Sequence, residues 1–152
     1  MDTIVYSFDH FNDDVQRIIE KIHQRRFNLI VGVNRGGCLP AVCLSHALKI
    51  PATMIDWSTR DGANVHPKSL HGYFEDISDR YKEILIVDDL IDSGTSMSKL
   101  IRTASIFCNV SIATLLHNTD VDMKVDHYWG TAYSRKEESR YFDFWWEMYR
   151  HV

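Results

Sequence analysis

The sequence predicts an α/β domain in which helices flank a central, mainly parallel β-sheet. Short runs rich in β-branched residues alternate along the chain with segments of helical periodicity. The clearest run, residues 84–87, is apolar at every position, which is typical of a strand buried on both faces of a parallel sheet. The chain has 152 residues, 45% of them hydrophobic, and no Pro- or Gly-rich linker interrupts it. We therefore expect residues 1–152 to form a single domain.

Strands and helices are expected to alternate in the first part of the chain. Asn12 or Asp13 caps the first helix, whose apolar residues recur at helical spacing, and Pro40 fits the first turn of the second helix. The expected strands are residues 3–6, 27–33 and 52–57. Residues 58–72 then lack any periodicity and contain two glycines and a proline, so we expect a long flexible loop there.

The second part of the chain continues the same alternation. The strand at residues 84–87 precedes an amphipathic helix over residues 95–108 and another buried strand over residues 110–116. Residues 125–129 are expected to add one short strand, and residues 141–149 form an aromatic tail. Strands that are separated by helices pair in parallel, which gives the predicted fold class.

The composition argues against a nucleic-acid polymer or a membrane as the main partner. The formal net charge is −4 at pH 7, so the chain has no overall positive field. No apolar segment reaches membrane-spanning length, and the N-terminus lacks a signal pattern. Cys38, Cys43 and Cys108 are odd in number and lack metal-ligand spacing. Reduced thiols are therefore expected, and with them a cytoplasmic protein.

A candidate phosphate-binding loop follows the strand at residues 84–87. Asp88 and Asp89 come directly after the strand, and residues 92–96 read Asp-Ser-Gly-Thr-Ser. This segment supplies hydroxyls, a glycine that tolerates positive φ and backbone N–H groups at the start of a helix. Taken alone, an acidic pair followed by capping residues is also a common structural feature. Ligands of open α/β sheets, however, bind beyond the carboxyl ends of the strands, where this loop must lie.

A second loop is expected at the same edge of the sheet. Residues 33–37 read Val-Asn-Arg-Gly-Gly and follow the strand at residues 27–33. Two glycines are compatible with a simple tight turn. With an arginine beside them, however, a guanidinium and backbone amides can bind a diphosphate together. The presence of the later loop favours the diphosphate interpretation.

Together these segments resemble the type I phosphoribosyltransferases, and most closely the xanthine-guanine (6-oxopurine) members. Residues 84–96 are similar to the family's phosphoribosyl pyrophosphate motif, and residues 33–37 with Pro40 to its pyrophosphate loop, where a serine usually stands at Asn34. The resemblance implies a cis peptide near Asn34-Arg35 and the type I fold. It also implies a mobile hood at residues 58–72 and a C-terminal aromatic base-binding region at residues 125–152.

The resemblance also assigns roles to the residues of both loops. It implies that Asp92 accepts a proton from the base as the catalytic residue, and that Asp88 and Asp89 bind the ribose. Both carboxylates are hard oxygen donors that suit Mg²⁺, the expected cofactor. The residues implied for the 5′-phosphate are Ser93, Gly94, Thr95 and Ser96, and those for pyrophosphate are Arg35, Gly36 and Gly37.

The base site matches the family less well. Purine-specific relatives place a lysine near the end of a strand, and the best-aligned residue here is His117. Histidine can donate to a carbonyl, but its protonation changes near neutral pH. Lys124 is the alternative donor. The aromatic residue that stacks on the base aligns with Tyr141, and Phe142 and Trp129 are alternatives.

The implied function is that of a Mg²⁺-dependent purine phosphoribosyltransferase of nucleotide salvage. Such an enzyme transfers the ribose-5-phosphate of phosphoribosyl pyrophosphate to guanine, xanthine or hypoxanthine, and its products are a nucleoside monophosphate and pyrophosphate. The main alternative is a regulatory nucleotide-sensing protein with the same fold and little or no transfer. A receiver-type phospho-acceptor module fits poorly, because its acidic pair belongs to the first strand. A homo-oligomer is expected. The sequence leaves open both the preferred base and whether the oligomer is a dimer or a tetramer.

Overall fold

Five strands of the computed structural model form a parallel sheet in the order β3-β2-β4-β5-β6. The structure describes residues 2–24, 26–57 and 67–150. The strands of this sheet are β2 (Leu29–Asn34), β3 (Ala52–Asp56), β4 (Glu83–Ile91), β5 (Asn109–Asn118) and β6 (His127–Tyr133). The strand β4, which contains the acidic pair, therefore occupies the middle of the sheet.

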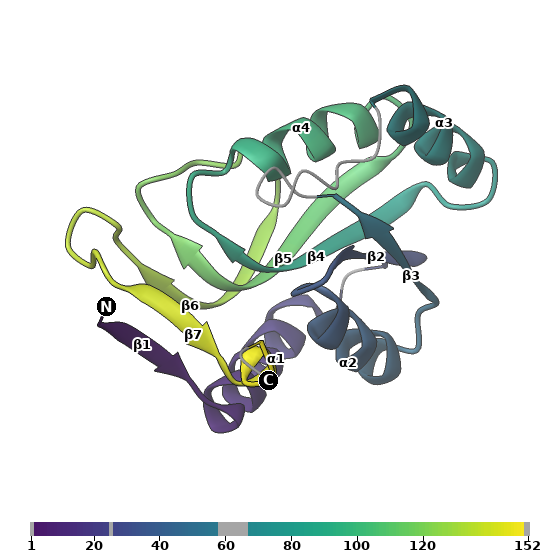
Figure 1. The fold of residues 1–152 in the computed structure, drawn as a ribbon. Helices are drawn as coiled ribbons and strands as arrows, with labels where there is room; N and C mark the ends of the chain where they lie inside the picture. Colours follow the sequence, from purple (N-terminus) through teal and green to yellow (C-terminus); the bar gives the residue numbers. More distant parts are fainter. Residues whose placement is uncertain (1, 25, 58–66, 151–152) are drawn as a thin grey trace.

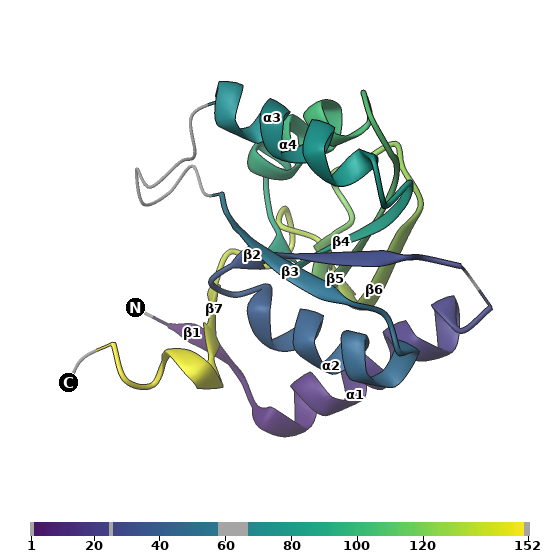
Figure 2. The same ribbon diagram turned by 90° about the vertical axis from the view of Figure 1, so that its right-hand side faces the viewer.

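Helices cover both faces of this sheet (Figures 1 and 2). α1 (Phe8–Ile22) and α2 (Cys38–Leu48) pack on one face, and α3 (Pro67–Ser78) and α4 (Thr95–Ala104) pack on the other. Alternate residues of β4 divide between two hydrophobic cores: Ile84 and Ile86 pack on the α3 and α4 side, and Leu85 and Val87 on the α1 and α2 side. Burial on both faces explains why this run has no polar position. The predicted α/β fold with a central parallel sheet is confirmed.

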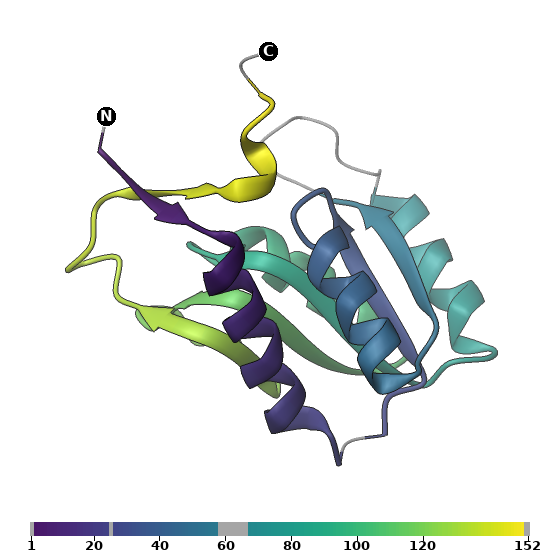
Figure 3. The same cartoon turned by 90° about the horizontal axis from the view of Figure 1, so that it is seen from below.

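A second, two-stranded sheet brings the two ends of the chain together. β1 (Thr3–Tyr6) pairs in parallel with β7 (Tyr141–Phe144), and the short 3-10 helix η1 (Trp145–Glu147) follows. Figure 3 shows both termini on the same side of the molecule. The ring of Phe144 stacks on Trp146 with centroids 4.7 Å apart and contacts Tyr6 at 5.1 Å. The predicted aromatic tail is thus partly a strand that packs on the N-terminus.

A buried carboxylate connects α1 to β1 and β6. Asp14 has no exposed surface, and it accepts hydrogen bonds from Tyr6 Oη at 2.6 Å, Thr131 Oγ1 at 2.7 Å and Arg17 Nη1 at 2.8 Å. Gly130 leaves room for it, because a Cβ there would lie 2.3 Å from the Asp14 Cβ. These bonds offset the cost of removing the charge from water.

Two expectations for the helices were wrong. α1 begins at Phe8, and its cap is Ser7, whose hydroxyl accepts from the His10 N–H at 3.2 Å, rather than Asn12 or Asp13. Residues 67–72, expected as part of a loop, form the first turns of α3. Burial of Leu70 and Phe74 against the sheet stabilises this helix despite its glycine. The remainder of the expected hood, residues 58–66, lies outside the described residues.

Three expected strands extend further than the pattern indicated. β4 continues through Asp88 and Asp89 to Ile91, because its pairing with β5 continues to the Ile91–His117 register. β5 runs to Asn118, and β6 reaches Tyr133 rather than ending at Trp129. Within the described part of the chain, none of the helices combines the length and apolar character needed to cross a bilayer.

Candidate active site

A cavity of about 720 Å³ opens at the carboxyl ends of β2, β3 and β4. The last residues of β2 and β4 and the residues that follow all three strands line it, together with residues that follow β7. This is the edge where ligands of open α/β sheets bind. Both loops singled out in the sequence therefore face one open cavity.

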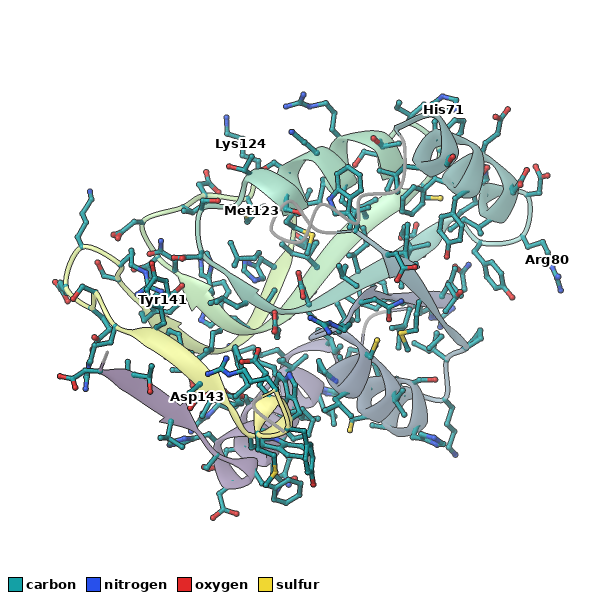
Figure 4. All side chains as sticks on the ribbon, in the orientation of Figure 1. His71, Arg80, Met123, Lys124, Tyr141 and Asp143 are labelled. Atoms are coloured by element: carbon teal, nitrogen blue, oxygen red, sulfur yellow. The ribbon has the colours of Figure 1, made fainter. Side chains whose placement is uncertain are left out.

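The loop between β4 and α4 forms one wall of the cavity. Gly94 has φ of 80°, a conformation that glycine adopts without strain, and the backbone N–H of Thr95 lies 3.3 Å from Ser93 Oγ. Met123 lies beside the start of α4 (Figure 4), and a Cβ on Gly94 would come within 3.1 Å of its sulfur. Trp57 donates to the Ser96 carbonyl at 2.8 Å and so ties the end of β3 to this loop. Backbone amides at the start of α4 make this wall suited to an anion.

The acidic pair lies against the arginine loop. Asp88 and Asp89 both line the cavity, and the Asp89 N–H donates to Asp88 Oδ1 at 2.8 Å. A Cβ on Gly36 would lie 1.9 Å from Asp89 Oδ2, so a larger residue there would displace the Asp89 carboxylate. In the described ranges, no three His, Cys, Asp or Glu side chains gather to hold a metal ion. Two carboxylates fit Mg²⁺ only if substrate oxygens and waters complete its coordination.

The arginine loop is fixed by both backbone and side-chain bonds. The Asn34–Arg35 peptide is cis, where the resemblance placed such a bond. The Gly37 N–H donates to the Val33 carbonyl at 2.8 Å, and Asn34 Nδ2 donates to Asp56 Oδ1 at 2.6 Å. A Cβ on Gly37 would lie 2.3 Å from the Val87 carbonyl oxygen, so this loop packs directly against β4. Arg35 and Gly36 line the cavity.

Asp92 also lines the cavity, and two donors, one at the end of β6 and one just after it, hold its carboxylate. Its Oδ1 accepts from Arg135 Nε at 3.0 Å and from Tyr133 Oη at 3.1 Å. Burial raises the pKa of Tyr133, and the negative charge of Asp92 raises it further, so the phenol remains a donor at neutral pH. Asn118 Nδ2 binds the Asp92 carbonyl at 2.9 Å. The backbone and side chain of Asp92 are therefore both fixed.

Comparison with known proteins identifies the family. A family model described as the phosphoribosyl transferase domain matches residues 5–139, which include both loops, the acidic pair and Asp92. The chain belongs to the phosphoribosyltransferase family. It therefore has a transferase fold, and its cavity lies where the family motif predicts. Among curated proteins, none matches the chain.

Solved structures with the same fold include three of nearly the same length. Purine phosphoribosyltransferase from Pyrococcus horikoshii is 24% identical, with a TM-score of 0.73 over 98% of this chain and 97% of that one. The xanthine-guanine-hypoxanthine phosphoribosyltransferase of Helicobacter pylori is 21% identical, with a TM-score of 0.71 over 97% and 95%. A Neisseria gonorrhoeae protein with bound ppGpp is 16% identical, with a TM-score of 0.69 over 98% and 92%. The fold is thus the type I phosphoribosyltransferase fold.

The cavity of this phosphoribosyltransferase collects most of the residues assigned to sugar and phosphate. Of the assigned residues, those that line it are Asp88, Asp89, Asp92, Ser93, Gly94, Ser96, Arg35 and Gly36. Thr95 begins α4, with its hydroxyl 3.3 Å from Ser93 Oγ, and Gly37 caps α2; both belong to the loops without lining the cavity. The roles of all ten remain predictions.

The structure does not bring His117 to this cavity. The side chain is buried with 7% exposure, and its ring lies 4.3 Å from that of His127 and 4.8 Å from Trp129. Burial lowers the pKa of His117, and it lowers the pKa of His127 to about 3. Both rings are therefore neutral at pH 7. This packing against β6 gives no support to His117 as the residue that reads the base.

The other two residues assigned to the base also lie outside the cavity lining. Tyr141 is 59% exposed on β7 (Figure 4), and Phe142 packs on Tyr133 with centroids 5.0 Å apart. Besides Arg35 and the three aspartates, the aromatic and charged residues that line the cavity are Trp57, Trp146, Glu147, Tyr149 and Arg150. Four of them fall within residues 125–152, the aromatic region that the resemblance implied for the base, although none of the four was assigned there individually. Trp57 was expected only as the end of a strand.

Proposed function

We propose that this phosphoribosyltransferase transfers the ribose-5-phosphate of phosphoribosyl pyrophosphate to a 6-oxopurine. The observation that carries the proposal is the contact between the two loops. Gly36 of the arginine loop lies directly against Asp89 of the sugar-binding motif, and Asp92 lines the same cavity. Groups suited to a diphosphate, a ribose and a proton on the base thus share one site.

Each step of the transfer has a candidate group in this cavity. The bond from C1′ to pyrophosphate breaks through a cation-like ribose, so the leaving diphosphate must be neutralised and the ribose held in line with the base. Arg35 and the backbone of its loop would bind the diphosphate. Asp88 and Asp89 would bind the ribose hydroxyls. Asp92 would accept the proton that the purine loses as its bond to C1′ forms.

Mg²⁺ is the cofactor that the acidic pair fits. Asp88 and Asp89 would hold it, since Mg²⁺ binds through one or two carboxylates and completes its shell with water and substrate phosphates. The ion, when bound, neutralises charge on the leaving diphosphate.

Similarity supports a purine as the acceptor. Two of the similar solved structures bear the names purine phosphoribosyltransferase and xanthine-guanine-hypoxanthine phosphoribosyltransferase. The free thiols Cys38, Cys43 and Cys108 support a cytoplasmic location, where such salvage would occur. A homo-oligomer is proposed as well.

A nucleotide sensor is the second candidate, because the similar Neisseria gonorrhoeae protein contains bound ppGpp. Incubation with phosphoribosyl pyrophosphate, Mg²⁺ and guanine, xanthine, hypoxanthine or adenine separates the two. Mass spectrometry should find a nucleoside monophosphate from at least one 6-oxopurine. Tight nucleotide binding without any such product would favour the sensor.

A further inference from the structure

Arg135 reaches Asp92 from a loop that no motif marked. This residue follows β6, 43 positions from Asp92 along the chain, and its Nε lies 3.0 Å from Asp92 Oδ1. The two side chains are 24% and 30% exposed, so neither is a freely solvated charge. A pair this far apart in sequence forms only in the folded protein.

Several bonds fix the guanidinium in this position. Arg135 Nη1 donates to the Glu138 carbonyl at 2.8 Å and to the Arg140 carbonyl at 2.6 Å. The group lies over the ring of Tyr133 at 5.0 Å and over that of Tyr141 at 5.8 Å. Because the planar guanidinium is already held in this way, it loses little further freedom of orientation when it binds Asp92. Its Nη2 is buried without a partner in the described chain, and the bonds of the other two nitrogens offset that cost.

Asn118 joins the backbones of the two residues. Its Nδ2 donates to the Asp92 carbonyl at 2.9 Å, and its Oδ1 accepts from the Arg135 N–H at 3.1 Å. One buried amide at the end of β5 therefore sets the separation of Asp92 and Arg135. The side-chain pair rests on a fixed backbone frame.

The donors occupy one oxygen of the carboxylate. Arg135 Nε and Tyr133 Oη both bind Oδ1, and among the described residues no donor is hydrogen-bonded to Oδ2. Because Asp92 lines the cavity, Oδ2 is the oxygen left for a substrate proton. We propose that Arg135, together with Tyr133, is a positioning residue that locks Asp92 Oδ1 and directs Oδ2 at the purine. This inference rests on the proposed function of Asp92.

A mutant cycle tests the positioning role. Correct general-base geometry contributes about 100- to 10,000-fold to rate, so Arg135→Gln should lower kcat by about 10- to 100-fold with little change in KM for phosphoribosyl pyrophosphate. In an Asp92→Asn background the same change should have almost no further effect. Tyr133→Phe should give a smaller loss, and Arg135→Lys should recover part of the rate. Arg80→Gln, at an exposed arginine after α3 and outside this network, is the control and should leave kcat unchanged.

Independent, multiplicative losses from Arg135→Gln and Asp92→Asn would overturn the inference, since a purely structural arginine would act through both backgrounds alike. If Arg135→Gln fails to fold, as judged by circular dichroism, the cycle of Tyr133→Phe with Asp92→Asn decides the question. If the unmodified protein makes no nucleotide, the proposed transfer is wrong. The readout of the same mutant cycle is then the Kd of hypoxanthine in the presence of phosphoribosyl pyrophosphate. If the effects of Arg135→Gln and Asp92→Asn on this Kd are coupled, the positioning role is supported. If they are additive in free energy, it is overturned.

Discussion

At the scale of single residues, the site depends on side chains whose orientation is set from a distance. Asp92 was predicted from a motif, but the donors that hold it, the last residue of β6 and a residue of the following loop, belong to a segment without a recognisable motif. His117 shows the reverse case: its position along the chain matched a family lysine, yet its ring packs against β6. Chain position gives the register of a residue, whereas tertiary packing decides which groups it contacts.

Replacing Asp92, the carboxylate proposed to accept the proton, should separate chemistry from binding. Asp92→Asn keeps the size of the side chain and removes its basicity. We expect kcat to fall by about 100-fold or more, and KM for phosphoribosyl pyrophosphate to change by about 3-fold or less. Steady-state kinetics measure both. Asp79→Asn, at an exposed aspartate after α3, is the control, and an unchanged kcat in Asp92→Asn would show that Asp92 is not the base.

A methyl group at Gly36 should displace Asp89. The added Cβ would lie 1.9 Å from Asp89 Oδ2, so the carboxylate must move away from the loop. We expect Gly36→Ala to raise KM for phosphoribosyl pyrophosphate by about 10-fold, the range of one lost charge-assisted contact. Gly72→Ala, where a Cβ would meet nothing within 4 Å, is the matched control. Equal KM values for the two variants would refute the contact between loop and acid.

At the scale of secondary-structure elements, boundaries were harder to predict than the elements themselves. The alternation of apolar runs and helical patterns located β2 to β5, α2 and α4 correctly. α3 was missed in part, because Pro67 and Gly72 suggested a loop while burial of Leu70 and Phe74 determines the helix. The pairing of β7 with β1 could not be foreseen, since those strands lie at opposite ends of the chain.

The contact between β5 and β6 should make stability depend on pH. Burial lowers the pKa of His127 to about 3, whereas the unfolded chain binds that proton below about pH 6.5. Its contribution to stability is therefore complete above pH 6.5 and is lost as the pH falls toward 3. Urea unfolding should show a loss of up to about 2 kcal/mol between pH 7 and pH 5 from this residue. His127→Gln should reduce that loss. An identical pH dependence of stability in the variant and the unmodified protein would show that His127 is not its source.

The buried Asp14 should be the main polar support between α1 and the two sheets. Asp14→Ala leaves Tyr6 Oη and Thr131 Oγ1 without their acceptor. We expect the free energy of unfolding to fall by about 3 kcal/mol. Asp13→Ala, at an exposed position of the same helix, should cost less than about 0.5 kcal/mol. Equal losses in chemical denaturation would mean that the network contributes nothing.

At the scale of the whole molecule, the sequence predicted the sheet, its two helical layers and the edge where the cavity opens. Those features follow from periodicity and from the rule that parallel strands deliver their carboxyl ends to one edge (Figure 2). The wall of the cavity that is built from Trp57 and from residues after β7 was not predictable in the same way. These residues meet only when the terminal strands pair.

The central claim is that this cavity transfers ribose-5-phosphate to a 6-oxopurine, and the rate of pyrophosphate release tests it most directly. The assay contains the protein, Mg²⁺, phosphoribosyl pyrophosphate and one base at a time: guanine, xanthine, hypoxanthine or adenine. We predict release with at least one of the three 6-oxopurines, a much lower rate with adenine, and no release without a base. Release with adenine alone would contradict the assigned base, and no release with any base would contradict the transfer itself.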